Sequence, residues 1–259
     1  AAECFVGRRA ETARLLPALR EGGVHTLVVT GPAGSGKSAL AVHLCWLLAR
    51  AGYSILPLYN SPKNPITWAR LLESVASQLK AMGREAEARD LIRSKAIKER
   101  MDGLINVLRG SRLLLLWDSL ELDQSGRIPD PDLSQFYRMM IRGLGAGRAI
   151  ITCRSLPAEG LTLPARAWQW KAEGLSQSQF VRRLLYMPAI ADRYRKGRIS
   201  FAALADHHRA ASGLPLRLDQ TASALALEDM TAGEDALSAL TSRLNQGSLT
   251  ALCRASVYD

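Results

Sequence analysis

The sequence contains little of what marks secreted, membrane-spanning or metal-binding proteins. Only four of its 259 residues are cysteines, and no two of them form a Cys-x-x-Cys pair, which argues against a structural zinc site or a disulfide framework. It also lacks a run of 18 apolar residues that would span a bilayer, and it does not open on a basic and then apolar secretion signal. We therefore expect a cytoplasmic protein with no membrane partner, whose cysteines act as small buried apolar side chains.

Acidic residues are scarce relative to basic ones. The chain has 24 Asp and Glu against 34 Lys and Arg, a formal net charge of +10, and such an excess is often found in nucleic-acid-binding proteins. The basic residues are nevertheless spread along the whole chain, and the densest groups, 93–100 and 193–198, are short and interrupted. Solvated helix faces and a site for a phosphate ligand account for much of the excess. Charge alone leaves a nucleic-acid partner open without favouring it.

Glycine, by contrast, is concentrated where it carries chemical meaning. Residues 31–38 read Gly-Pro-Ala-Gly-Ser-Gly-Lys-Ser, the G-x-x-x-x-G-K-S spacing of a phosphate-binding P-loop. An apolar strand precedes the loop and a helical pattern follows it, so a chance glycine-rich turn explains the sequence less well. In a P-loop, backbone amides and the helix N-terminus cradle the phosphates, the lysine reaches the β- and γ-phosphates, and the serine hydroxyl ligates Mg²⁺. We assign nucleotide contacts to Gly31, Gly34, Ser35, Gly36, Lys37, Ser38 and Ala39.

Strand and helix patterns alternate along the first two thirds of the chain. The expected strands are 26–30, 54–59, 112–118 and 149–153, with 167–170 as a candidate fifth. Amphipathic helical stripes lie between them, which predicts an α/β fold with a P-loop NTPase parallel sheet sandwiched by helices. Strand patterns stop after Gly174. We therefore expect residues 1–173 to form the nucleotide-binding domain and residues 174–259 a small α-helical lid domain.

The apolar run that ends in Asp118 has the form of a Walker B strand. A carboxylate at the carboxyl end of such a strand can hold Mg²⁺, whereas the alternative is an ordinary aspartate that starts a turn. Glu121 either orients a hydrolytic water or caps the next element. Arg154, which follows the strand 149–153, can contact a γ-phosphate, although arginines are also common at exposed strand ends. The catalytic candidates are Lys37, Asp118, Glu121 and Arg154, and the Mg²⁺ candidates are Ser38 and Asp118.

Five short motifs, taken together and in order, resemble the STAND class of signal-transduction NTPases, which includes the NB-ARC and NACHT modules. They are 5–8 (Phe-Val-Gly-Arg), 115–121 (Leu-Leu-Trp-Asp-Ser-Leu-Glu), 151–155 (Ile-Thr-Cys-Arg-Ser), 174–180 (Gly-Leu-Ser to Phe) and 212–216 (Ser-Gly-Leu-Pro-Leu). The motifs are distributed over nearly the whole chain, at spacings plausible for that family.

The resemblance implies a role for each matching position. It places Val6 and Arg8 at the adenine, and Pro215 in a helical lid that closes over the adenine and ribose. It assigns contacts with phosphate and Mg²⁺ to Lys37 and Ser38 and contact with Mg²⁺ to Asp118. It assigns sensing of the γ-phosphate to Arg154. The implied cofactors are ATP or ADP with Mg²⁺, and no guanine-reading Asn-Lys-x-Asp stretch is present.

The sequence also departs from the family pattern. Ser119 stands where many members carry a second acidic residue directly after the Walker B aspartate, so we expect hydrolysis to be slow or to depend on Glu121. Too few residues follow Pro215 for the winged-helix domain that usually completes these proteins. We therefore expect an excised or truncated module without its flanking effector and sensor domains, with a homo-oligomer in the ATP state as one candidate assembly.

The leading hypothesis is an ATP/ADP-operated switch. It would be a weak Mg²⁺-dependent ATPase whose nucleotide state gates oligomerisation or effector activation, with bacterial defence signalling as one setting. The alternative is a DNA-associated AAA+ ATPase of the replication-initiator or transposition-helper type, which the positive charge suits but which lacks a compact basic patch. A small-molecule kinase is a third hypothesis, and no arginine-rich lid segment is evident for it.

Overall fold

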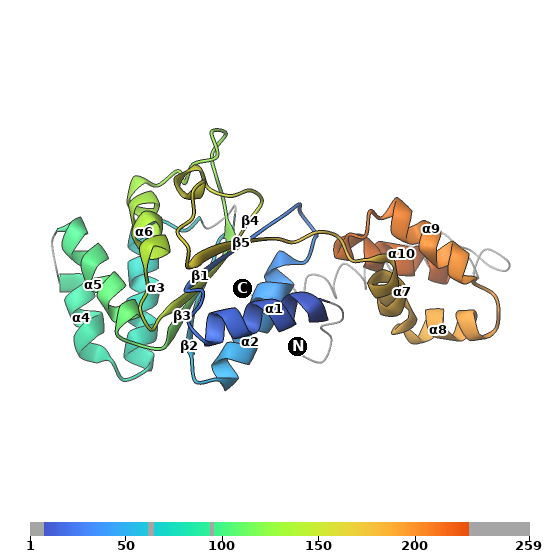
Figure 1. Ribbon diagram of the computed structural model, residues 1–259, viewed down its shortest axis with the longest axis horizontal. Helices are drawn as coiled ribbons and strands as arrows, with labels where there is room; N and C mark the ends of the chain where they lie inside the picture. The colour runs from blue at the N-terminus through green and yellow to red at the C-terminus, as the bar shows by residue number, and fades with distance from the viewer. Residues whose placement is uncertain (1–7, 62–64, 94–95, 228–259) are drawn as a thin grey trace. The chain divides into compact units, whose positions relative to one another are not determined.

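In the computed structural model, which describes residues 8–61, 65–93 and 96–227, the chain divides into two compact units (Figure 1). The first unit ends at Gly174 and the second begins at Leu175, one residue after the boundary expected from the sequence. Each cluster of buried apolar side chains belongs to one unit or the other. The two units are therefore described separately.

Five parallel strands form the sheet of the first unit. They are β1 (Thr26–Thr30), β2 (Ser54–Tyr59), β3 (Leu113–Leu120), β4 (Arg148–Cys153) and β5 (Ala167–Lys171), in the spatial order β2-β3-β4-β1-β5. Both β1 and β4 are buried along their full length. Burial on both faces is why such strands read as continuous apolar runs rather than alternating ones. The predicted α/β fold is confirmed, and the candidate fifth strand is present.

Helices cover both faces of this sheet (Figure 1). One face packs against α1 (Arg9–Arg20) and α2 (Lys37–Arg50), and the other against α3 (Trp68–Ala81), α5 (Ile97–Arg109) and α6 (Pro131–Arg142). Because side chains alternate along a strand, neighbours on β1 enter different cores. Val28 joins the core beneath α3, α5 and α6, whereas Leu27 and Val29 join the core beneath α1 and α2.

The strand that carries Asp118 is longer than the sequence pattern predicts. We expected it to end at Asp118, whereas β3 continues to Leu120. Its register with β4 shifts between Trp117 and Leu120, and Ser119 has a φ of 61°, a left-handed conformation that is uncommon for residues with a β-carbon. The apolar pattern could not predict this extension because the two added residues lie in an irregular part of the strand.

The described part of the second unit is built from helices. They are α7 (Gln177–Leu185), α8 (Pro188–Arg195), α9 (Phe201–Ala210) and α10 (Pro215–Leu227). Helix α7 begins with a reciprocal cap, in which Ser176 Oγ accepts from Gln179 N and Gln179 Oε1 accepts from Ser176 N. Phe180, Leu184 and Leu204 are fully buried in the core of this unit. Across the described ranges, no helix combines the length and the apolarity needed to cross a membrane.

Two short helices were not predicted from the sequence. Helix α4 (Glu85–Arg93) buries only Ala88 and Leu91, and α8 buries only Ile190 and Arg193. A helix that buries so few side chains has little apolar periodicity for a sequence pattern to reveal. Both helices lie away from the predicted site residues in the sequence.

Candidate nucleotide-binding site

The sheet order brings the predicted site residues to one edge. Strands β1, β4 and β3 are parallel neighbours, so their carboxyl ends face the same way. The P-loop follows β1, Arg154 follows β4, and Asp118 lies near the end of β3. Strand β4 lies between β1 and β3, so along the sheet Arg154 is nearer to the P-loop than Asp118 is. Ligands of open α/β sheets bind at this carboxyl edge.

The P-loop takes a backbone path that requires glycine. Gly31, Gly34 and Gly36 have φ angles of 149°, 75° and 83°, and Gly36 is the residue that begins α2 as its N-cap. A β-carbon on Gly31 would lie 2.4 Å from the carbonyl oxygen of Ala172, so the loop also passes too close to neighbouring backbone for any other residue. The loop therefore has the cradle shape and the helix N-terminus that a phosphate group needs.

The side chain of Lys37 is held over the P-loop by backbone carbonyls of the loop. Its Nζ donates to the carbonyl oxygens of Gly31 (2.9 Å) and Pro32 (2.8 Å). Burial lowers the pKa of Lys37; the neighbouring Arg154 also lowers it, whereas Cys153 and Asp118 raise it. The ends of β3 and β4 lie at the same carboxyl edge of the sheet as the start of the P-loop, where Gly31 N donates to the carbonyl oxygen of Arg154. The structure thus brings together Lys37, Asp118 and Arg154.

Asp118 is positioned by a threonine that was not among the predicted site residues. Thr152 Oγ1 donates to Asp118 Oδ1 at 2.6 Å and accepts from the backbone N–H of Ser119 at 2.8 Å. Thr152 is fully buried. Its sequence signal is a polar residue inside the otherwise apolar strand 149–153. Thr152 therefore links the Asp118 carboxylate to the backbone of the bend that follows it.

Asn60, at the end of β2, holds the same bend from the other side. Its Nδ2 donates to the carbonyl oxygen of Ser119 at 3.1 Å, and its Oδ1 accepts from the backbone N–H of Ile66 at 2.7 Å. Its own N–H donates to the carbonyl oxygen of Asp118 at 3.2 Å. Asn60 was also missed, because an asparagine after a strand reads as an ordinary turn residue.

The oxygen donors of the site suit Mg²⁺. Ser38 lies in the first turn of α2 and Asp118 near the end of β3, and both are partly exposed. A hydroxyl and a carboxylate are hard ligands of the kind Mg²⁺ takes when phosphate oxygens and waters complete its shell. Among the described residues there is no group of three or more His, Cys, Asp or Glu that would hold a metal by itself. Ser38 and Asp118 are therefore the residues that would hold Mg²⁺ together with phosphate oxygens and waters.

The remaining predicted residues occupy varied positions. Arg154 is exposed, and its carbonyl oxygen accepts from Gly31 N at 3.2 Å, which ties the start of the P-loop to the end of β4. Glu121 is exposed just beyond β3, and Ala39 is exposed in the first turn of α2. Pro215 is the first residue of α10 in the second unit. Val6 lies outside the described residues, so its role, like those of the others, stays a prediction.

Arg8 is buried against the P-loop rather than exposed. Its Nη2 donates to the carbonyl oxygen of Ser35 at 2.5 Å and to that of Glu173 at 2.6 Å, while its Nη1 donates to Glu11 Oε1 at 3.2 Å. One guanidinium therefore fastens the P-loop to the last residues of the first unit. These contacts occupy the side chain without involving a nucleotide, and contact with adenine stays a prediction.

Replacing Arg8 with alanine should destabilise the first unit by about 1–3 kcal/mol, because the carbonyl of the buried Ser35 and that of Glu173 would lose their donor. All five tryptophans precede Gly174, so urea unfolding followed by tryptophan fluorescence reports on this unit. Arg9→Ala, which changes the exposed neighbour, is the control and should unfold like the parent chain. If both variants unfold at the same urea concentration, Arg8 does not hold the loop.

A glycine-rich loop between a buried parallel strand and a helix N-terminus, with its lysine beside the strand-end Asp118, defines a P-loop NTPase. Residues 4–149, more than half of the sequence, match the family described as the AAA ATPase domain. The chain belongs to this family. It matches none of the curated proteins with which it was compared.

Two solved structures share the fold. A STAND protein with a tetratricopeptide repeat sensor from Pyrococcus horikoshii matches with a TM-score of 0.56 at 18% identity, over 83% of this chain and 29% of that protein. The Walker-type ATPase of Pyrococcus abyssi matches with a TM-score of 0.54 at 14% identity, over 98% of this chain and 77% of that one. The chain thus spans less than a third of the STAND protein. At these identities, both matches show a likeness of the fold.

Proposed function

We propose that this AAA ATPase domain is the ATP/ADP-binding switch module of a STAND-type signal-transduction ATPase. The observation that supports this proposal is the grouping of Lys37, Asp118 and Arg154 at one end of the sheet. Only ATP carries a γ-phosphate, and a group that distinguishes ATP from ADP must lie beside the P-loop lysine. Arg154 is our candidate for that group, because it directly follows β4, the strand next to β1, and its carbonyl oxygen accepts from the N–H of Gly31 at 3.2 Å.

In this proposal, each residue of the site has a separate role. Lys37 is freed from the carbonyls of Gly31 and Pro32 to pair with phosphate oxygens, and Ser38 and Asp118 are the ligands for Mg²⁺. When bound, the ion neutralises phosphate charge. Thr152 keeps the Asp118 carboxylate in place through its 2.6 Å hydrogen bond. Preference for adenine over guanine rests on the resemblance to the STAND class.

Slow hydrolysis is part of the proposal. The residue after Asp118 is Ser119, whose N–H and carbonyl are both held by neighbouring side chains, and it offers no carboxylate to activate water. Glu121 is the next acidic residue along the chain and is exposed. A slow ATPase keeps ATP bound for long periods, which suits a switch that gates oligomerisation or effector activation. A ligand moves such an equilibrium only through contacts that differ between its two states.

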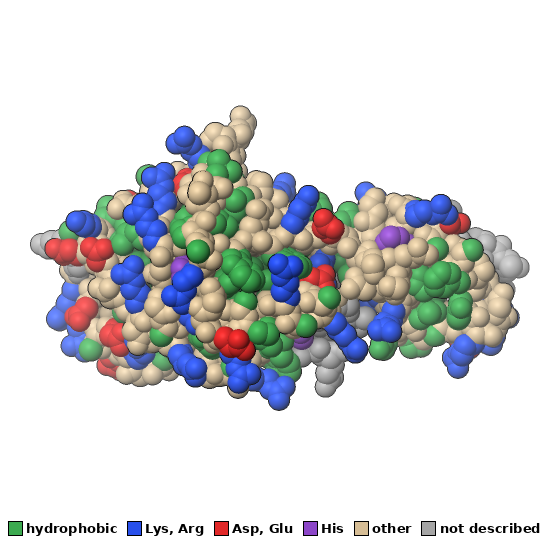
Figure 2. Space-filling model, viewed as in Figure 1, with side chains coloured by type: hydrophobic (Ala, Val, Ile, Leu, Met, Phe, Trp, Pro, Cys, Tyr) green, Lys and Arg blue, Asp and Glu red, His purple; other side chains and the backbone are tan. Residues whose placement is uncertain are grey.

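The face of the molecule in Figure 2 gives no support to a DNA-associated role. Figure 2 shows Lys and Arg side chains scattered among acidic ones over the face in view, rather than gathered into one patch. Duplex binding draws on clustered cations and weakens steeply with salt. A salt-dependent DNA-binding assay is the direct test of this alternative to the switch.

Arg154→Ala should lower the affinity for ATP by roughly tenfold or more and leave that for ADP within about twofold, because a charge-assisted contact to the γ-phosphate contributes on the order of 1.5–3 kcal/mol. Pro215→Ala should instead weaken both nucleotides together, since the nucleoside is common to them. Calorimetric titration of each variant with each nucleotide measures the difference. Equal losses of ATP and ADP affinity in Arg154→Ala would show that Arg154 does not sense the γ-phosphate.

A further inference from the structure

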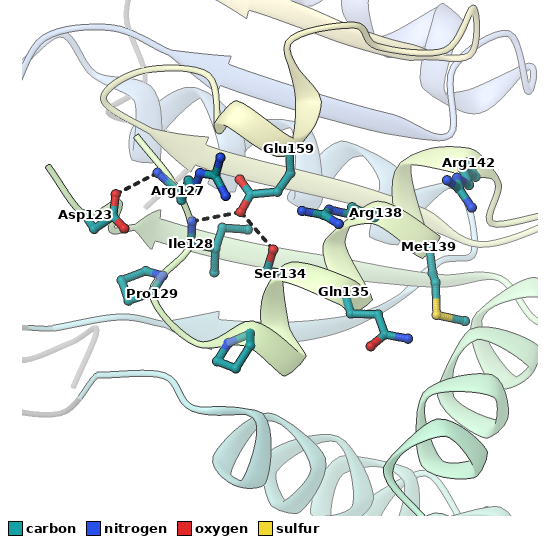
Figure 3. A pocket seen from close by; sticks show the side chains of 11 residues that line it. Asp123, Arg127, Ile128, Pro129, Ser134, Gln135, Arg138, Met139, Arg142 and Glu159 are labelled. Carbon is teal, nitrogen blue, oxygen red and sulfur yellow. Dashed lines mark hydrogen bonds between the residues drawn. The ribbon is translucent and has the colours of Figure 1, made fainter. Parts of the chain in front are cut away.

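A groove of about 640 Å³ opens on the first unit, apart from the P-loop (Figure 3). It is bounded by the loop after β3, by α6 and by the short 3-10 helix η2 (Ala158–Gly160). Two of its walls continue the strands of the nucleotide site. Asp123 follows Asp118 beyond β3, and Glu159 follows Arg154 beyond β4. None of the residues assigned to nucleotide or Mg²⁺ lines it.

Three arginines supply the positive charge of this groove. Arg127 lies on the loop, and Arg138 and Arg142 project from successive turns of α6 (Figure 3). All three are exposed. Within the described part of the chain, no hydrogen bond or ion pair engages their guanidinium groups, whereas the buried Arg8 and Arg148 each donate to carbonyl oxygens of distant segments. The groove therefore presents three exposed cations, of which Arg127 also acts on the charge of the neighbouring Asp123.

The two carboxylates of the groove, in contrast, are engaged by the fold. Asp123 Oδ1 accepts from the backbone N–H groups of Ser125 (2.8 Å) and Arg127 (2.9 Å), and these bonds help to lower the pKa of Asp123. Glu159 Oε1 accepts from Ser134 Oγ at 2.8 Å. Both act as braces: Asp123 fixes the loop and Glu159 joins η2 to α6. The groove is preformed, which reduces the entropy lost when a ligand binds.

The lining of the groove indicates the class of ligand. Its apolar side chains are aliphatic, from Ile128, Pro129, Pro131 and Met139, and no aromatic residue lines it. Single-stranded nucleic acids are held by aromatic stacking as well as by cations, so a base has no platform here. An extended peptide, whose alternate side chains point in opposite directions, can place apolar groups on this lining and charged groups toward the arginines.

We propose that this groove binds an acidic segment of a partner protein. Arg138 and Arg142 are four residues apart on α6, which separates their stems by about 6 Å. Carboxylates two residues apart on an extended peptide are spaced by roughly 6.6 Å, so one such pair matches the spacing of the two arginine stems. Carboxylate–guanidinium pairs can be bidentate and directional. The groove is thus a partner-binding surface, additional to the nucleotide site and independent of the proposed switch.

The test uses a fluorescein-labelled peptide of about twelve residues in which glutamate alternates with leucine or alanine, titrated with the full chain and followed by anisotropy. The variant is Arg138→Gln/Arg142→Gln. Its matched control is Arg89→Gln/Arg93→Gln, which changes two exposed arginines at the same spacing on α4. A peptide with glutamine in place of glutamate and a labelled oligothymidylate of similar length complete the set of probes.

The acidic peptide should bind the parent chain and the α4 control equally and the α6 variant about three- to tenfold more weakly, as expected for two exposed pairs. The glutamine peptide should bind the parent chain no more tightly than the acidic peptide binds the α6 variant. Binding should persist in Lys37→Ala without nucleotide, which separates this inference from the switch. The inference is overturned if the acidic peptide fails to bind below about 1 mM, if both double variants bind alike, or if the oligothymidylate binds the groove more tightly than the peptide.

Discussion

Replacing Lys37 with alanine is expected to weaken ATP binding by roughly a hundredfold while the first unit stays folded. Among the described residues, the ammonium of Lys37 donates to the carbonyls of Gly31 and Pro32 and to no other group, so its removal deletes a phosphate ligand and little packing. A charge-assisted hydrogen bond contributes on the order of 1.5–3 kcal/mol, and a P-loop lysine reaches two phosphates. Titration with a fluorescent mant-ATP measures the loss.

The control for this prediction is Lys80→Ala, which removes an exposed lysine from the last turn of α3. Its affinity for ATP should equal that of the parent chain. Tryptophan fluorescence during urea unfolding establishes that Lys37→Ala is still folded, since every tryptophan lies in the first unit. Unchanged ATP affinity in a folded Lys37→Ala chain would contradict the assignment of residues 31–38 as the phosphate site.

The second large effect is expected at Asp118. Asp118→Asn keeps the shape of the side chain and an oxygen for Thr152 to donate to, but removes the negative charge that Mg²⁺ requires. Affinity for ATP with Mg²⁺ should therefore fall about tenfold, while affinity for ADP measured in the presence of EDTA should change by less than about twofold. Calorimetric titrations of ATP with Mg²⁺, and of ADP with EDTA, give the two values.

Thr152→Val provides a matched comparison, since it removes the hydroxyl that holds Asp118 at 2.6 Å while conserving the shape of the side chain. It should weaken ATP binding with Mg²⁺ in the same direction as Asp118→Asn but by a smaller factor, because the carboxylate remains. Equal losses of metal-dependent and metal-free binding in Asp118→Asn would indicate that the carboxylate supports the fold instead of the metal.

The parts of the site that the sequence predicted are those encoded over a few consecutive residues. The P-loop needs three glycines at fixed spacing because of their φ angles and because Gly31 approaches Ala172 closely. Its motif can therefore be identified from the sequence alone. Strands β1 and β4 are buried on both faces, and their apolar runs predict them directly. Parallel pairing then places Asp118 and Arg154 at the edge where the P-loop begins.

The parts that the sequence did not predict depend on contacts between distant segments. Arg8 meets Glu173 across a sequence separation of 165 residues, and no local pattern encodes that pairing. Thr152 and Asn60 contact both Asp118 and the bend at Ser119 from neighbouring strands, and that bend lies beyond the predicted end of the strand. The groove lined by Arg138 and Arg142 likewise needs the loop after β3 and the helix η2 to be brought together.

The measurement that tests the central claim most directly is calorimetric titration of the full chain with ATP in the presence of Mg²⁺, repeated with ADP as competitor. An ATP/ADP switch at the P-loop predicts one ATP bound per chain, displacement of that ATP by ADP, and loss of the binding heat in Lys37→Ala. Absence of ATP binding by the folded chain, or binding that Lys37→Ala leaves intact, would contradict the account.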